Sequence, residues 1–110
     1  MRYSSLSLMR QQLVRTMQRL NFGNLERLCV RSGDPVWHPA PRMTRDLMLG
    51  KANRQATPPT NPDFELKEPV VSLFTVFDQE GEMEIERLEV QNGLPFRLVI
   101  REQVGPQPGA

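Results

Sequence analysis

Apolar residues recur every three or four positions near the start of the chain, the spacing that places side chains on one face of a helix. Over residues 5–20 this stripe consists of Leu6, Met9, Leu13, Met17 and Leu20. Serines at positions 4, 5 and 7 are N-cap candidates, because a hydroxyl accepts from a backbone amide that the first turn leaves unpaired. Residues 5–20 are therefore predicted to form a helix that ends near Gly23.

A strand, a glycine turn and a second strand are predicted after this helix, and the same pattern returns later in the chain. Leu25–Val36 reads LERLCVRSGDPV, and Ile85–Phe96, sixty residues later, reads IERLEVQNGLPF. The apolar phase of the helix recurs at the same offset, since Leu6, Leu13, Val14 and Met17 correspond to Leu66, Leu73, Phe74 and Phe77. The chain therefore contains a helix–hairpin unit written twice.

The repeat predicts a second helix over residues 68–80. Pro69 is tolerated in the first turn of such a helix, and Gly81 lies just past its end. The alternative is a strand, because VVSLFTVF is rich in β-branched and aromatic residues and DQEG could form a turn. The apolar phase shared with the first unit favours the helix.

The register of the second hairpin follows from which residues must share a face. A two-residue turn would mix polar and apolar residues on each face of the hairpin. A three-residue loop, Gln91–Gly93, instead pairs Leu88 with Phe96 and Val90 with Leu94, so we expect the longer loop.

One β-bulge near position 86 or 87 is also expected, because the apolar residues before it are out of phase with those after it. The bulge returns Ile85 to the core opposite Leu98, and Met83 opposite Ile100. In the first copy, Leu25 and Leu28 are out of phase in the same way.

These elements predict an α+β fold of two αββ units in pseudo-twofold relation, with a largely antiparallel four-stranded sheet and two helices on one face. Residues 1–103 are expected to form a single domain, with RMTRDLMLG at 42–50 left unassigned. The expected parts are the units 5–38 and 66–102, a proline-rich connection over 39–65 and a disordered tail over 104–110.

The composition indicates in which cellular compartment the protein is expected. A chain of 110 residues with a single cysteine, Cys29, can form neither an intrachain disulfide nor a Cys-rich zinc site. No stretch approaches the roughly 18 apolar residues of a membrane-spanning helix, so a cytoplasmic protein without membrane contact is expected. The first twenty residues are rich in arginine and serine and free of acids, as in a mitochondrial presequence. Their apolar phase recurs in the second unit, which favours a structural helix.

The sequence offers no catalytic constellation. His38 is the single histidine, and the residues near it supply neither a nucleophile nor a second ligand. Cys29 lies in a predicted strand, where free cysteine usually packs as a small hydrophobe. The acidic run from Glu80 to Glu89 lacks the spacing of a calcium loop. We therefore expect no enzyme activity, no catalytic or metal-binding residue and no cofactor.

Charge is distributed unevenly between the halves of the chain. Residues 1–55 carry ten basic and three acidic side chains, and residues 56–110 carry four basic and ten acidic ones. Flexible arginines beside a basic helix face can neutralise phosphates. The candidate nucleic-acid-binding residues are Arg15, Arg19, Arg42, Arg45, Lys51 and Arg54. No aromatic pair is placed beside them for base stacking.

The sequence thus favours a non-enzymatic binding or assembly module. Its expected partner is another protein or a second copy of the chain, met through a sheet edge or the helix face. The alternative is a nucleic-acid-binding accessory protein that uses the basic N-terminal half.

Overall fold

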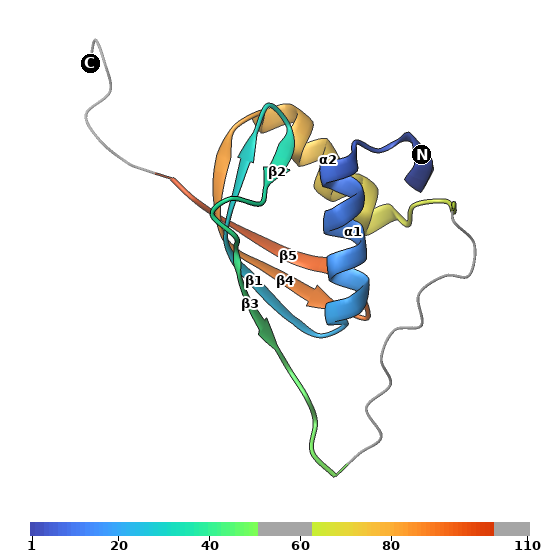
Figure 1. Cartoon of the computed structure of the whole chain (residues 1–110), viewed down its shortest axis with the longest axis vertical. Helices are drawn as coiled ribbons and strands as arrows, with labels where there is room; N and C mark the ends of the chain where they lie inside the picture. The colour runs from blue at the N-terminus through green and yellow to red at the C-terminus, as the bar shows by residue number, and fades with distance from the viewer. Residues whose placement is uncertain (51–62, 103–110) are drawn as a thin grey trace.

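The computed structural model describes residues 1–50 and 63–102. Within them, two helices and an antiparallel sheet of five strands form the α+β fold predicted from the sequence. Both helices lie on one face of the sheet (Figure 1). In chain order the elements are the 3-10 turn η1 (Tyr3–Ser5), α1 (Leu8–Leu20), β1 (Gly23–Arg31), β2 (Asp34–Val36), β3 (Arg42–Arg45), α2 (Glu68–Glu80), β4 (Met83–Gln91) and β5 (Leu94–Arg101).

Helix α1 begins three residues later than predicted. Ser7 is its N-cap, and the Ser7 hydroxyl accepts a 3.2 Å hydrogen bond from the Arg10 amide. Leu6 is buried ahead of the helix, where the chain is still extended. Met9 is 39% exposed and therefore lies outside the buried stripe in which the sequence placed it. The buried face begins at Leu13.

Helix α2 confirms the second helix predicted over 68–80, with Pro69 in its first turn and Gly81 as its C-cap at φ +73°. The strand alternative is wrong. Burial of one complete apolar face of the helix against the sheet outweighs the intrinsic preference of these residues for a strand. The buried side chains of this face are Val70, Leu73, Phe74 and Phe77.

The sheet order is β2-β1-β4-β5, and β3 adds a fifth strand that the sequence left unassigned. β2 pairs with residues 29–31 of β1, and β3 pairs with residues 23–26 of the same strand. Two short strands therefore share one edge of the sheet, while β5 forms the other edge.

The turn of the second hairpin has two residues, and the expected three-residue loop is wrong. Asn92 and Gly93 take φ values of +54° and +73°, and Gln91 lies opposite Leu94. Positive φ at both central residues is the type I′ geometry, whose twist matches that of the flanking strands. The predicted Val90–Leu94 pair is therefore not formed.

A bulge in β5 restores the separation of faces that a longer loop was expected to provide. Val90 pairs with Pro95, the register then shifts, and Leu88 pairs with Leu98 in place of the predicted Phe96. Phe96 is the additional residue and is 63% exposed. A side chain assigned to the core by alternation therefore lies at the surface.

The bulge predicted near position 86 or 87 is confirmed. Glu86 is the additional residue before the ladder resumes at Arg87. Ile85 lies opposite Ile100 instead of the expected Leu98, because the shorter turn and the β5 bulge each move the register by one residue. Ile85 is fully buried, while Met83 is half-buried against the core and has no partner in β5.

The change of apolar phase that was expected in β1 occurs at a residue with positive φ. Arg27 has φ +59°, and the leucines at positions 25 and 28 are both buried. The local change in strand direction lets two leucines three positions apart face the helices.

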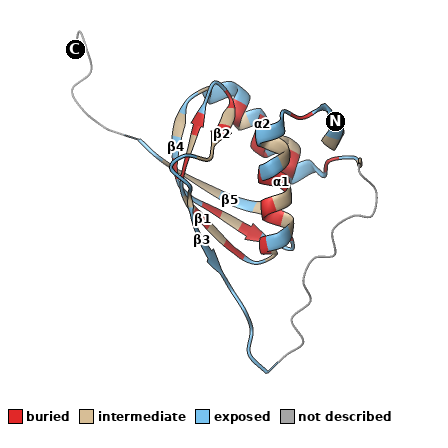
Figure 2. Cartoon of the chain, in the orientation of Figure 1, coloured by how far each residue is buried: buried red, intermediate tan, exposed pale blue. Residues whose placement is uncertain are grey.

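One hydrophobic core lies between the helices and the sheet (Figure 2). Its largest fully buried side chains come from both units. They include Leu13, Met17, Leu20, Leu25 and Leu28 from the first, and Phe74, Phe77, Ile85 and Leu88 from the second. The first helix is therefore part of the folded core.

The two units match in their element bounds and in their pairing. α2 and β4 begin and end sixty residues after α1 and β1. In the β1–β4 ladder, Leu25 pairs with Leu88 and Leu28 pairs with Ile85, so each pair is the sixty-residue equivalent of the other. These equivalences support the pseudo-twofold relation, which remains a prediction. The expected tail at 104–110 lies outside the described residues.

Candidate functional site

Two grooves lie at equivalent positions in the two units, each between the first half of a helix and the second strand of the following hairpin. The first measures about 420 Å³ and is lined by Met9, Gln12, Pro35, Val36, Trp37 and His38. The second measures about 210 Å³, and its lining includes the residues sixty positions later, Pro69, Ser72, Pro95, Phe96, Arg97 and Leu98. The repeat has thus produced two grooves with different chemistry.

The first groove holds the single tryptophan and the single histidine. Trp37 is half-buried against the core, as expected for a residue at the edge of the first hairpin, and its indole N–H is buried without a hydrogen-bond partner among the described residues. His38 is exposed. The lining residues contribute no carboxylate, thiol or hydroxyl group, so nothing there would make His38 part of a triad or a metal site.

The second groove lies at the long free edge of the sheet. Leu73 and Val76 of α2 and Leu88 of β4 join Pro95 and Leu98 in a largely apolar lining. Because β5 is the last strand in the sheet order, one side of this groove has no neighbouring strand among the described residues. An apolar recess beside an unpaired strand is one of the recurring forms of a peptide-binding surface.

Phe96 stands at this groove because of the β5 bulge. The ring is 63% exposed and lines the groove beside Arg97, whose side chain is also 63% exposed. Arg97 Nε lies 3.7 Å from a carboxylate oxygen of Glu89 on β4. An exposed aromatic ring beside an exposed arginine is the combination that protein interfaces favour.

Arg10 was not singled out from the sequence, yet it joins three elements. Its guanidinium donates to the carbonyl of Gly33 at 2.7 and 3.0 Å and to Asp78 of α2 at 2.5 Å. The guanidinium carbon also lies 5.0 Å from the ring centroid of Phe74. With a side chain 13% exposed, Arg10 is a structural cation, and the helical spacing that put it outside the apolar stripe gave no sign of these partners.

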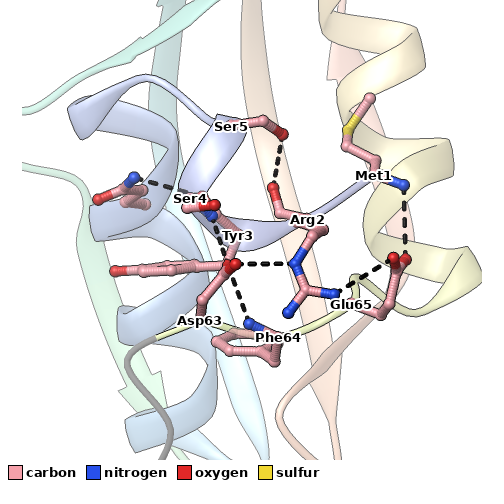
Figure 3. Close-up of polar contacts among 9 residues, drawn as sticks. Met1, Arg2, Tyr3, Ser4, Ser5, Asp63, Phe64 and Glu65 are labelled. Carbon is pink, nitrogen blue, oxygen red and sulfur yellow. Dashed lines mark hydrogen bonds and ion pairs between the residues drawn. The ribbon is translucent and has the colours of Figure 1, made fainter.

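The N-terminal residues pair with the residues that precede α2 (Figure 3). The amide of Tyr3 donates to the carbonyl of Phe64 at 2.9 Å, and the two rings stack with centroids 4.9 Å apart. Arg2 Nε donates to Asp63 at 2.7 Å. Together with backbone amides, chiefly that of Ser4, this bond lowers the pKa of Asp63 to about 2.

This N-terminal pairing also occupies Arg15, one of the predicted nucleic-acid-binding residues. The Arg15 guanidinium carbon lies 4.5 Å from the Tyr3 ring centroid and 5.6 Å from that of Phe64. Its Nε donates to the Tyr3 hydroxyl at 3.1 Å, and its Nη1 donates to the Gln18 side-chain oxygen at 3.3 Å. Arg15 is therefore a packing residue in this structure.

The other basic candidates are exposed. The side chains of Arg19, Arg42 and Arg45 make no hydrogen bond or ion pair with another described residue, and Arg42 lies opposite Glu26 in the β1–β3 ladder. A Cβ built on Gly23 would lie 3.0 Å from the Arg45 Cα and 3.0 Å from Leu20 of α1, so β3 passes close to the end of that helix. Lys51 and Arg54 lie outside the described residues.

The remaining candidates from the sequence are the cysteine and the carboxylates. Cys29 is half-buried between Glu84 and Val36 in the sheet ladders. Within residues 1–50 and 63–102, no three His, Cys, Asp or Glu side chains are grouped so as to hold a metal ion. No helix in that part of the chain is long and apolar enough to cross a membrane.

Comparison with known proteins gives no relative: no family model, curated protein or solved structure matches this chain significantly.

Proposed function

We propose that this chain is a non-enzymatic binding or assembly module that meets a protein at the groove between α2 and β5. The observation that carries the proposal is Phe96, a large aromatic side chain 63% exposed above an apolar groove at the end of the sheet. Burying an exposed phenylalanine against a partner is strongly favourable, and such residues are frequent interface anchors.

The contrast with Leu8, another exposed apolar residue, provides a matched control. Leu8 is 76% exposed on the first turn of α1 and does not line the second groove. Phe96→Ser and Leu8→Ser each remove one exposed apolar side chain. A contact that uses the groove responds to the first substitution alone.

The experiment combines light scattering over a range of concentrations with affinity capture and identification of the retained proteins. An oligomer, or an identified partner, that persists with Leu8→Ser and is lost with Phe96→Ser supports the proposal. A monomer at every concentration that retains no protein, or an association indifferent to Phe96→Ser, would overturn it.

The second candidate function is nucleic-acid binding by the basic half. It is favoured by three exposed arginines whose side chains make no hydrogen bond or ion pair with the described residues. Arg19 lies in the last turn of α1, and Arg42 and Arg45 lie on β3, whose end packs close to that helix. Phosphate contacts by such side chains would make the affinity fall steeply as salt rises.

Fluorescence anisotropy with DNA and RNA oligonucleotides from low to physiological salt tests this candidate. Salt-sensitive binding that is lost with Arg19→Glu combined with Arg45→Glu, and kept with Arg101→Glu on the opposite edge, supports it. An absence of binding at low salt would contradict this candidate function. Arg15→Glu is unsuitable here, because that change would also disrupt the packing against Tyr3.

A further inference from the structure

The proposed function leaves open what kind of segment the groove receives, and β5 itself carries information on this. β5 is eight residues long and ends the sheet order β2-β1-β4-β5. No described strand pairs with its outer side. An unpaired edge of this length presents backbone N–H and C=O groups to any extended chain of suitable chemistry.

The strand that β5 already pairs with indicates that chemistry. Along β4, acidic residues oppose arginines, because Glu84 lies opposite Arg101 and Glu89 lies opposite Arg97. Between them, apolar residues oppose apolar ones: Ile85 lies opposite Ile100 and Leu88 opposite Leu98. Each arginine therefore has a carboxylate on its β4 side, while the outer side of β5 supplies none from the described residues.

Beside the apolar positions of β5, the groove offers room for a partner's apolar side chains. It measures about 210 Å³ and is lined by Pro69, Val76, Phe96 and Leu98, among others. An added strand would place alternate side chains toward this groove and the remaining ones toward Arg97 and Arg101.

Self-pairing of two β5 strands fits the same surface poorly. An antiparallel pair centred on Val99 puts Arg97 of each copy opposite Arg101 of the other. A pair centred on Arg97 puts two identical cations opposite each other. A pair centred on Leu98 uses Pro95, which has no N–H to donate. Like charges directly opposite are destabilising in a ladder, so the occupant is better sought in another protein.

We infer that the outer edge of β5 binds an extended acidic segment of a partner protein, which adds a strand to the sheet. In an antiparallel arrangement the segment has the pattern acidic, apolar, any residue, apolar, acidic. Its two carboxylates lie opposite Arg101 and Arg97, and its two apolar residues lie opposite Ile100 and Leu98. This inference rests on the proposed function and names the partner class of the same groove.

The test uses labelled peptides and the full chain. The probe has the core Glu-Ile-Thr-Ile-Glu, and its matched control replaces both glutamates with lysine. Binding of the acidic peptide is expected to be about tenfold or more tighter than that of the basic one. Arg97→Glu combined with Arg101→Glu is expected to reverse the preference, and Arg19→Glu is expected to leave it unchanged.

Two further readouts separate strand addition from simple charge attraction. Bound acidic peptide is expected to slow amide hydrogen exchange in residues 94–101. Methylation of alternate peptide nitrogens, on the edge that would pair with β5, is expected to abolish binding. Thermal unfolding of each variant confirms that it is folded.

Several outcomes would overturn the inference: no binding of the acidic peptide, equal binding of both peptides, or no change in exchange within β5. If those results accompany an association that Phe96→Ser still abolishes, the proposed function stands and the partner class is wrong. If no association depends on Phe96, the proposed function fails as well.

Discussion

The backbone amide of Gly33 donates a 2.8 Å hydrogen bond to the carbonyl oxygen of Gly81, so the turn of the first hairpin is fastened to the end of the second helix. The equivalent bond runs from Gly93 to Asn21 at 2.9 Å and fastens the second turn to the first helix. Each unit therefore satisfies a backbone group at the helix end of the other, where intrahelical bonds run out. A pair of equivalent backbone hydrogen bonds therefore connects the two units.

Space around the hairpin glycines predicts how they respond to substitution. A Cβ on Gly93 would lie 3.3 Å from the Gln18 Cα, whereas a Cβ on Gly81 would have nothing within 4 Å. Both have φ +73°. Asparagine occupies the equivalent helix end of the first unit, where Asn21 adopts φ +65° and ψ −65°, close to the φ +73° and ψ −56° of Gly81. Gly81→Asn is therefore expected to cost less than about 1 kcal/mol of unfolding free energy, and Gly93→Asn about 1–3 kcal/mol. Urea unfolding measures both, and equal losses would contradict the crowding argument.

The contacts of Arg10 with both units are expected to contribute to the unfolding free energy of the protein. Arg10→Met keeps much of the packing against Phe74 but removes the hydrogen bonds to Gly33 and Asp78. Because the side chain is largely buried, we expect a loss of about 2 kcal/mol in unfolding free energy. Arg19→Met, at an exposed position of the same helix, is the control and is expected to change stability by less than about 0.5 kcal/mol. Similar effects of the two changes would show that Arg10 is not a structural cation.

Asp63 predicts an acid-sensitive contribution to stability. The Arg2 guanidinium lowers the pKa of Asp63 in the folded chain to about 2, below its ordinary value of 3.8. The carboxylate is therefore stabilising above about pH 4, and this contribution is lost as the pH falls toward 2. Asp63→Asn is expected to be less stable than the parent at neutral pH, and the difference should shrink over that acid range.

Urea unfolding at a series of pH values measures this difference. The control is the same substitution in an Arg2→Met background, where we expect most of the pH-dependent difference to be absent. A difference that stays constant from neutral pH to pH 2 would show that the ion pair does not act on stability.

Truncations of Leu88 and Phe96 are predicted to lower the stability by very different amounts. Leu88 is fully buried, so Leu88→Ala is expected to cost about 2–5 kcal/mol. Phe96 is 63% exposed, so Phe96→Ala is expected to cost less than about 1 kcal/mol in dilute solution. Thermal or urea unfolding decides this. A large loss at Phe96 would favour the three-residue loop, in which these two side chains face each other in the core.

Local signals that recur along the chain were sufficient to identify most elements from the amino-acid sequence. The apolar phase shared between residues 5–20 and 68–80 identified α2 despite its β-branched composition, because a helix is chosen by the face that it buries. The repeat also located both hairpins and the bulge beside Glu86, since out-of-phase apolar residues can face one core only through an additional residue.

The tertiary structure decided the features that depend on contacts between distant residues. Alternation alone could not place the compensating bulge at Phe96, because a longer turn and a β5 bulge restore the same faces. Nor could it separate Arg15, held against Tyr3 and Phe64, from Arg19, which is exposed. Both are arginines on a helix surface, and their surroundings come from chain segments that only the fold brings together.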